Sequence, residues 1–207
     1  MILVTPFVPG SADYGVLASA MNRRGPQRRH AHVVLSRECD GEEAAEFGSS
    51  VSALFSKSVG RAVPDAESDT VRKRENALFR SACRFLASYE PLDGEAPGVP
   101  MLYYDQGWLP SGGQWLDRVQ SEYYASQAPG ALGKWKDVDG VMRLWGPLVV
   151  GQSYARASAL IDFLPDRVHW RHYLRHEIGR VMVESSTMGS ANSAAIRPDY
   201  KNRKAKA

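Results

Sequence analysis

The chain has 207 residues, which is enough for one sizeable hydrophobic core and short for two. Its composition, 43% hydrophobic and 24% charged, is ordinary for a globular protein. No apolar run is long enough to cross a membrane, and the apolar start lacks the basic residues and long apolar middle of a secretory signal. We therefore expect one soluble, cytoplasmic domain in which Cys39 and Cys83 are free thiols, because they share no CxxC or Cys/His spacing.

The net charge of +3 is unevenly distributed along the chain. Basic residues gather in three clusters: Arg23, Arg24, Arg28, Arg29 and His30; Arg72, Lys73 and Arg74; and Lys201, Arg203, Lys204 and Lys206. Such clusters bind phosphates or nucleic acid. A basic tail is also typical of a solvated terminus, so both interpretations of the third cluster stay open.

The first third of the chain predicts alternating strands and helices. Residues 2–8 form an apolar strand that ends at a Pro-Gly turn, and Asp13 can cap a helix that runs to about residue 24. A β-branched strand over 32–36 and a helical apolar spacing over 41–55 follow. The order strand, helix, strand, helix is typical of a parallel sheet covered by helices.

The rest of the chain continues this alternation. We expect loops over 65–70 and 91–100, a turn-rich segment over 107–113, helices over 71–89, 114–124, 153–164 and 168–183, a strand over 101–105, and one or two strands over 141–150. The helical spacing predicts core positions at Phe79, Phe85, Leu86, Trp115, Leu116 and Val119. We expect one folded unit over 1–185 and a flexible basic tail over 186–207.

The strand predicted over 101–105 carries the clearest chemical signal, because it ends in a single carboxylate followed by a turn rich in Gly and Pro. Ligands of α/β sheets bind at the carboxyl ends of the strands, so Asp105 would face the site. There it could hold a divalent cation, Mn²⁺ or Mg²⁺, that neutralises a diphosphate. It could equally cap the turn.

Four blocks of the sequence together resemble the GT-A glycosyltransferases, a family with many members encoded by viruses and phages. The first is Tyr103-Tyr104-Asp105 with the proline turn, then Gly113-Gln114-Trp115-Leu116-Asp117 and Glu122-Tyr123. The others are residues 72–79 with Asn76 and Phe79, residues 146–154, and residues 170–178. The resemblance covers about residues 1–180. It implies a single GT-A-like domain with a mixed, mainly parallel sheet, a nucleotide-sugar donor and a divalent cation, in the host cytoplasm if the source is viral.

The sequence departs from that pattern at two acid positions. The first acid of the family's acid-x-Asp motif falls on Tyr103, which leaves Asp105 as the metal ligand, and the acid that often serves as base falls on Arg171. His172 stands beside Arg171 and has a side chain suited to proton transfer near neutral pH. His169, His172 and His176 share one helical face, which fits a solvated face better than a metal stripe.

Four further residues are candidates for donor contact. Asp13 follows the first strand, where the resemblance places the base and ribose, and it is also suited to cap the next helix. Arg72 and Lys73 are suited to contact phosphate, or form a solvated helix start. Asn76 belongs to the family's segment before the metal strand.

The sequence therefore predicts sugar transfer from a nucleotide-sugar donor to an acceptor, which is a modified DNA base, a glycan or a protein. Asp105 and His172 would carry the chemistry. The alternative is a catalytically inactive protein of the same fold with a binding or structural role, which the departures at Tyr103 and Arg171 favour. A third hypothesis, a nucleic-acid-binding accessory protein, depends on the basic clusters alone.

Overall fold

The computed structural model describes residues 1–10, 13–64, 70–90, 98–104, 107–127, 130–157, 168–172, 182–189 and 194–198. Their centre is a seven-stranded sheet in the order β10-β6-β9-β4-β1-β2-β3. Strand β9 is antiparallel to both of its neighbours, and every other pairing in this sheet is parallel. The expected mixed, mainly parallel sheet is confirmed.

The strands of this sheet are β1 (Ile2–Pro6), β2 (Gln27–Ser36), β3 (Phe55–Ala62), β4 (Met101–Tyr103), β6 (Ala131–Gly133), β9 (Leu148–Val150) and β10 (Met182–Glu184). Two small antiparallel pairs accompany it, β5 (Trp108–Pro110) with β11 (Ile196–Pro198), and β7 (Trp135–Val138) with β8 (Val141–Leu144). The helices are α1 (Tyr14–Arg24), α2 (Gly41–Val51), α3 (Val71–Ser88), α4 (Trp115–Ala125) and α5 (Gln152–Ala157), with a 3₁₀ turn η1 (Ser52–Leu54). None of the helices in the described ranges is long and apolar enough to span a bilayer.

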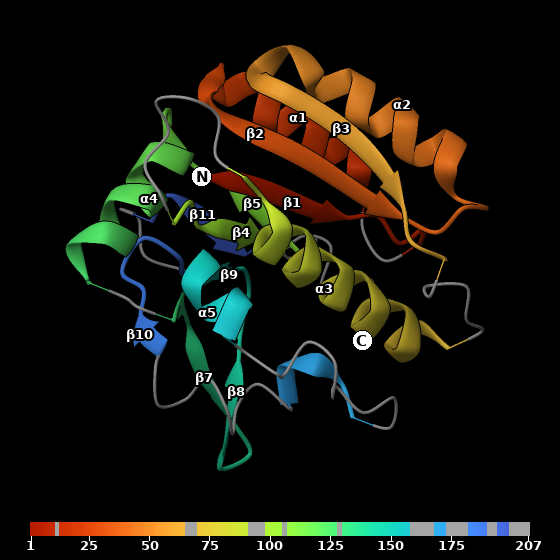
Figure 1. The fold of residues 1–207 in the computed structure, drawn as a ribbon. Coiled ribbons are helices and arrows are strands. Elements are labelled where there is room, and N and C mark those ends of the chain that lie inside the picture. The colour runs from red at the N-terminus through yellow and green to blue at the C-terminus, as the bar shows by residue number, and fades with distance from the viewer. Residues whose placement is uncertain are drawn as a thin grey trace.

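Helices cover both faces of the sheet, and each face has its own core. Side chains of α1, α2 and α4 pack on one face, as Met21, Phe47 and Leu116 illustrate. Side chains of α3 and α5 pack on the other face with Trp170. Figure 1 shows α3 on the opposite side of the sheet from α1 and α2. The predicted core positions are buried, except that Phe85 is only partly buried.

The N-terminal units follow the sequence signals closely. The Asp13 carboxylate accepts a hydrogen bond from the Val16 N–H at 3.0 Å, which satisfies a donor that the first turn of α1 leaves unpaired. Helix α1 ends at Gly25, whose φ of 78° suits glycine. Both cysteines are free, as expected, and burial raises the pKa of Cys83 to about 12.

Strand β3 was not predicted, and the end of the helix expected over 41–55 was wrong. Residues 55–62 pair with β2 at the edge of the sheet, and all of them after Phe55 are exposed or half-buried. An edge strand of this kind needs no alternation of apolar side chains, so periodicity does not reveal it. Strands β6 and β7 were also missed, and β2 begins five residues before the expected start.

Two segments after residue 181, Met182–Glu184 and Ile196–Pro198, form strands that the sequence did not predict. The helix expected over 168–183 is wrong at its end, because Met182–Glu184 pairs with β6 as a strand. Part of the expected flexible tail forms β11, and the carboxylate of Glu122 accepts hydrogen bonds from Ser185, Ser186 and Thr187. Burial alone would raise the pKa of Glu122, but these hydrogen bonds outweigh it and lower the pKa. Residues 199–207, with the basic tail cluster, lie outside the described residues.

A buried histidine makes the stability of the fold sensitive to acid. His32 lies between Thr5 Oγ1 and Ser58 Oγ, each 3.1 Å from a ring nitrogen, and burial lowers its pKa from 6.5 to about 3. In the unfolded chain His32 binds a proton near pH 6.5, so its neutral folded form costs stability as the pH falls from 6.5 towards 3. At pH 4.5 this loss is roughly 2–3 kcal/mol.

We predict that urea unfolding at pH 7.0 and pH 4.5 will show a larger drop in unfolding free energy for the native chain than for His32→Gln. The difference between the two drops should be about 2–3 kcal/mol, because carboxylates contribute equally to both proteins. Equal drops would show that His32 is not held neutral by the fold.

Candidate functional site

The carboxyl ends of β1, β2 and β4 form the edge of the sheet where a ligand site is expected. Helices α1, α2 and α3 follow β1, β2 and β3 in the chain, so each begins at this edge. Their N-termini carry the positive end of the helix dipole, which the carboxylates of Asp13 at α1 and of Glu42 and Glu43 at α2 offset. Arg72 and Lys73 are exposed on the first turn of α3 and add two cations at the same edge.

A groove between α1 and α2 opens at this edge. It has a volume of about 600 Å³ and is lined by Phe7, Pro9, Gly10, Tyr14, Gly15, Ala18, Glu43, Glu46, Phe47 and Ser50; we call it the α1–α2 groove. The rings of Phe7 and Tyr14 stack with centroids 4.2 Å apart, and Phe47 meets Tyr14 edge-on at 5.2 Å. The groove therefore has an aromatic wall beside two carboxylates.

Hydrogen bonds to the backbone fix the Tyr14 ring in this wall. Its hydroxyl accepts the Val8 N–H at 2.7 Å and donates to the Pro6 carbonyl at 3.0 Å. Asp13, the residue before Tyr14, caps α1. This confirms the capping role, which was one of the two roles predicted for Asp13. Contact between Asp13 and a donor stays a prediction.

On the other face of the sheet, α3 holds a segment that lies more than ninety residues later in the chain. Asn76 donates from Nδ2 to the Val168 carbonyl at 2.8 Å and accepts the Trp170 N–H on Oδ1 at 2.8 Å. Asn76 is fully buried, and both its amide group and its carbonyl oxygen bond to the backbone of residues 168–172. We call these residues the 168–172 segment. These contacts support the 168–172 segment, and contact between Asn76 and a donor stays a prediction.

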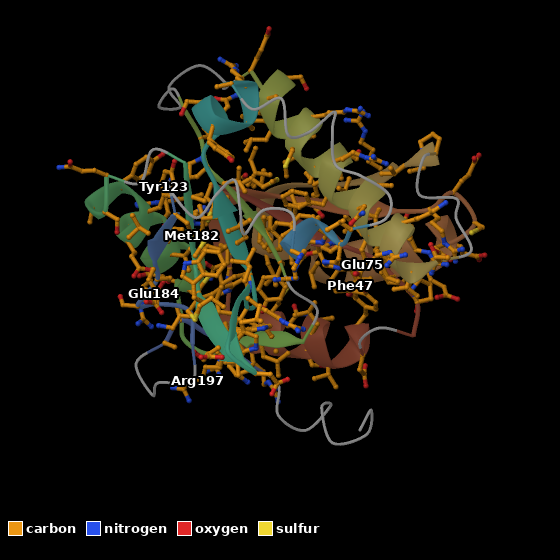
Figure 2. The ribbon with its side chains drawn as sticks, turned by 90° about the horizontal axis from the view of Figure 1, so that it is seen from below. Phe47, Glu75, Tyr123, Met182, Glu184 and Arg197 are labelled. Atoms are coloured by element: carbon orange, nitrogen blue, oxygen red, sulfur yellow. The ribbon has the colours of Figure 1, made fainter. Side chains whose placement is uncertain are left out.

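Glu75 adds a second attachment between α3 and the 168–172 segment. Its carboxylate lies 2.6 Å from His169 Nε2, while His169 Nδ1 accepts the Arg171 N–H at 3.2 Å. Because Nδ1 is an acceptor, the ring proton is on Nε2 and points to Glu75. Figure 2 places Glu75 in the same half of the view as Phe47 of the α1–α2 groove, whereas Tyr123 and Glu184 lie in the other half.

A stack of aromatic rings includes Tyr103, which stands at the position of the first acid of the family's motif. Trp170 lies on Phe79 with centroids 4.2 Å apart and an interplanar angle of 6°, and Tyr103 meets both rings edge-on. Tyr103 is buried, and burial together with the nearby charge of Glu75 raises its pKa well above the usual value. Its ring is a packing element and offers no anionic oxygen to a metal.

Arg171 ties this stack to the loop between β8 and β9. Its guanidinium lies 4.3 Å from the Trp170 ring centre, and its Nη1 donates to the Gly146 carbonyl at 2.8 Å. Gly146 has a φ of +83°, and a Cβ there would come within 2.4 Å of the Trp108 ring. Only glycine fits this position. The backbone conformation of Gly146 places the carbonyl oxygen that accepts the hydrogen bond from Arg171.

A second cavity lies beside Arg171. It has a volume of about 300 Å³ and is lined by Met142, Arg143, Leu144, His169, Arg171 and His172; we call it the β8 pocket. His172, the expected base, is exposed at this pocket. The structure thus brings His172 to the edge that also carries Arg72 and Lys73, but on the opposite face of the sheet from the α1–α2 groove.

The described residues do not form a metal site. No group of three or more His, Cys, Asp or Glu side chains suited to a cation occurs among them, and Tyr103 is buried in rings. Asp105 and His176 lie outside the described residues, so metal binding by Asp105 stays a prediction. Glu43, Glu46, Glu75 and Tyr14 were not predicted as site residues; only the Tyr14 position, next to a strand end, gave a sequence signal.

No family model matches the chain, and no curated protein matches its sequence. Among solved structures, mouse xyloside xylosyltransferase 1 in its apo form has a TM-score of 0.61 and 9% identity, over 98% of this chain and 99% of that chain. The glycosyltransferase GlyE of Streptococcus pneumoniae has a TM-score of 0.59 and 10% identity, over 89% of this chain and 45% of that chain. The fold is GT-A-like. At identities of 9% and 10%, the similarity establishes the GT-A-like fold and not a function.

The Asn76 contacts can be tested by an isosteric change. We predict that Asn76→Asp lowers the unfolding free energy by about 1–3 kcal/mol, because a carboxylate oxygen replaces the donor that faces the Val168 carbonyl. Amide exchange measured by NMR should accelerate at Trp170.

The matched control is Asn22→Asp on α1, where an exposed asparagine also donates to main-chain carbonyls. It should cost less than about 1 kcal/mol and leave Trp170 exchange unchanged. Equal losses in the two variants, or native exchange at Trp170 in Asn76→Asp, would contradict the assigned role.

Proposed function

We propose that this protein transfers a sugar from a nucleotide-sugar donor to an acceptor. The observation that carries the proposal is the α1–α2 groove, because it opens beside the carboxyl end of β1 in a fold shared with two glycosyltransferases. Ligands bind at this end of parallel strands. The names of those two proteins describe their own activity, and the α1–α2 groove is the feature of this chain that would accommodate a donor.

The groove fits the nucleobase of the donor. A base can stack beside the Phe7 and Tyr14 rings, as planar heteroaromatic groups do on aromatic side chains. Ring and exocyclic N–H groups of a base can donate to Glu43 or Glu46. Two carboxylates would repel a diphosphate, so the diphosphate belongs outside the groove, towards the N-terminus of α3 with Arg72 and Lys73.

Different residues of this chain would then stabilise the leaving group and accept the proton of the acceptor. Cations on the first turn of α3 would stabilise the charge that grows on the departing diphosphate. The acceptor would approach from the side of Trp145, Gly146 and His172, and His172 would take the proton of the attacking hydroxyl. The Asn76 and Glu75 contacts would keep the 168–172 segment, and with it His172, in place.

A titration calorimetry panel of nucleoside diphosphate sugars, with and without Mn²⁺, tests the donor site. We predict binding of at least one donor and a loss of about tenfold or more in affinity in Glu43→Gln or Glu46→Gln, because the base loses a charged acceptor. Glu42→Gln is the matched control, since Glu42 lies on the first turn of α2 and does not line the groove. No binding across the panel, or equal losses in all three variants, would contradict the donor site.

Asp105 is the predicted metal ligand. Its replacement distinguishes a role in metal binding from a role as a turn cap. Asp105→Asn should abolish any Mn²⁺-dependent part of donor binding and leave the melting temperature nearly unchanged, because amide oxygens bind divalent cations more weakly than carboxylates. A clear loss of melting temperature with intact Mn²⁺ dependence would identify Asp105 as a cap.

A second candidate function is binding without catalysis. Tyr103 favours it, because a buried ring occupies the position of the family's first acid. Donor binding without release of nucleoside diphosphate, over a range of acceptors, would favour this candidate over sugar transfer.

A further inference from the structure

The β8 pocket has a composition that the donor site does not explain. Four of its six lining residues are Arg143, His169, Arg171 and His172, and the other two are Met142 and Leu144. No Asp or Glu occurs among the described residues that line it. A pocket with basic walls and an apolar floor is complementary to an anionic group attached to an apolar one.

The Arg171 guanidinium is preorganised for such a group. Its position is fixed by the Trp170 ring at 4.3 Å and by the bond to the Gly146 carbonyl at 2.8 Å. Trp170 is in turn held flat against Phe79. A guanidinium carries five N–H donors in a planar fork that matches the oxygens of a phosphate or carboxylate, and little entropy is lost when the fork is already fixed.

Two described carboxylates near the pocket, those of Glu75 and Asp137, are engaged in other contacts. Glu75 accepts the His169 Nε2–H on the α3 side, and Asp137, opposite Met142 in the hairpin, accepts the Gly140 N–H in its own turn at 2.8 Å. Arg143 lies directly opposite Lys136 in the pairing of β7 with β8. Like charges directly opposite each other are unfavourable, and a bound anion would offset this repulsion.

The floor of the pocket supplies an apolar surface. Met142 is 44% exposed and is one of four large hydrophobic residues that are exposed in the described part of the chain. Leu144 beside it is 5% exposed and belongs to the core on the α3 face. A flexible thioether next to the fixed Arg171 guanidinium accommodates an apolar group of varied shape.

We propose that the β8 pocket binds an oxyanion, a phosphate or a carboxylate, on the acceptor, with an apolar part of the acceptor on Met142. This inference rests on the proposed function, because it assigns the pocket to the acceptor of the sugar. The acceptor is favoured over the donor diphosphate because Arg72 and Lys73, to which the diphosphate is assigned, do not line the pocket, whereas the expected base does. His172 lines the same pocket, so a hydroxyl of the anchored acceptor would lie near the expected base.

Phenyl phosphate and benzoate are suitable probes, because each joins one oxyanion to one ring, and phenol is the neutral control. Titration of the full chain without nucleotide, followed by NMR, should show binding of phenyl phosphate or benzoate and none of phenol. Whichever anion binds more tightly identifies the oxyanion. Failure of both to bind would overturn the proposal, whatever the donor panel shows, because no nucleotide is present.

Variants of Met142 test the place of binding without disturbing the fold, because the side chain is exposed. Met142→Glu should weaken binding of the preferred anion about tenfold or more by repulsion, and Met142→Gln, of the same shape and no charge, by less than about threefold. Arg171→Lys should also weaken binding, since it loses the fork. Arg156→Gln is the matched control and should leave affinity unchanged, because Arg156 of α5 donates to the Ala87 and Tyr89 carbonyls at the end of α3 and does not line the pocket.

Competition with a nucleoside diphosphate decides between acceptor and donor. We expect the anion to bind equally well when the nucleoside diphosphate is saturating. Competitive displacement would assign the pocket to the donor diphosphate and overturn the proposal. Equal affinity of the native chain and Met142→Glu would overturn it as well, because binding would then lie elsewhere.

Discussion

Two hydrogen bonds of one buried carboxamide, that of Asn76, hold the 168–172 segment against α3. Asn76 uses its donor and its acceptor on the backbone around residue 169, and no other polar side chain of α3 in the described ranges is fully buried. A satisfied buried amide fixes one arrangement, because any shift leaves a polar group unpaired. The Trp170 stack, the Arg171 fork and the wall of the β8 pocket all depend on this arrangement.

The sheet explains why the α1–α2 groove and the β8 pocket open at one edge. Parallel strands β1, β2 and β3 each lead into a helix, so three helix N-termini gather at the carboxyl edge. Strand β9 runs the opposite way and starts beside the end of β4, which brings Gly146 to the same edge. Gly146 lies against the Trp108 ring with no room for a side chain, so the loop that supports Arg171 is fixed from both sides. The α1–α2 groove and the β8 pocket open on opposite faces of this edge.

The sequence predicted those parts of the fold whose side chains repeat with a regular period. Helix α1 with its Asp13 cap, helix α3 and strand β4 were found because apolar spacing and capping are local. Strand β3 was missed because an edge strand has little apolar surface to bury, and β11 because its partner β5 is distant in the chain. The role of Asn76 depends on residues 92–94 positions later, and no local pattern records such a contact. No signal in the sequence distinguishes Glu43, Glu46 and Glu75 from solvated helix residues. The fold places the first two in the α1–α2 groove and the third against His169.

We propose that the carboxyl edge of the sheet binds a nucleotide sugar with its base in the α1–α2 groove. A crystal structure of the chain with a bound nucleoside diphosphate tests it most directly. The account predicts the base against the Phe7 and Tyr14 rings, within hydrogen-bonding distance of Glu43 or Glu46, and the diphosphate directed towards Arg72 and Lys73. A base placed elsewhere, with the groove filled only by solvent, would contradict it.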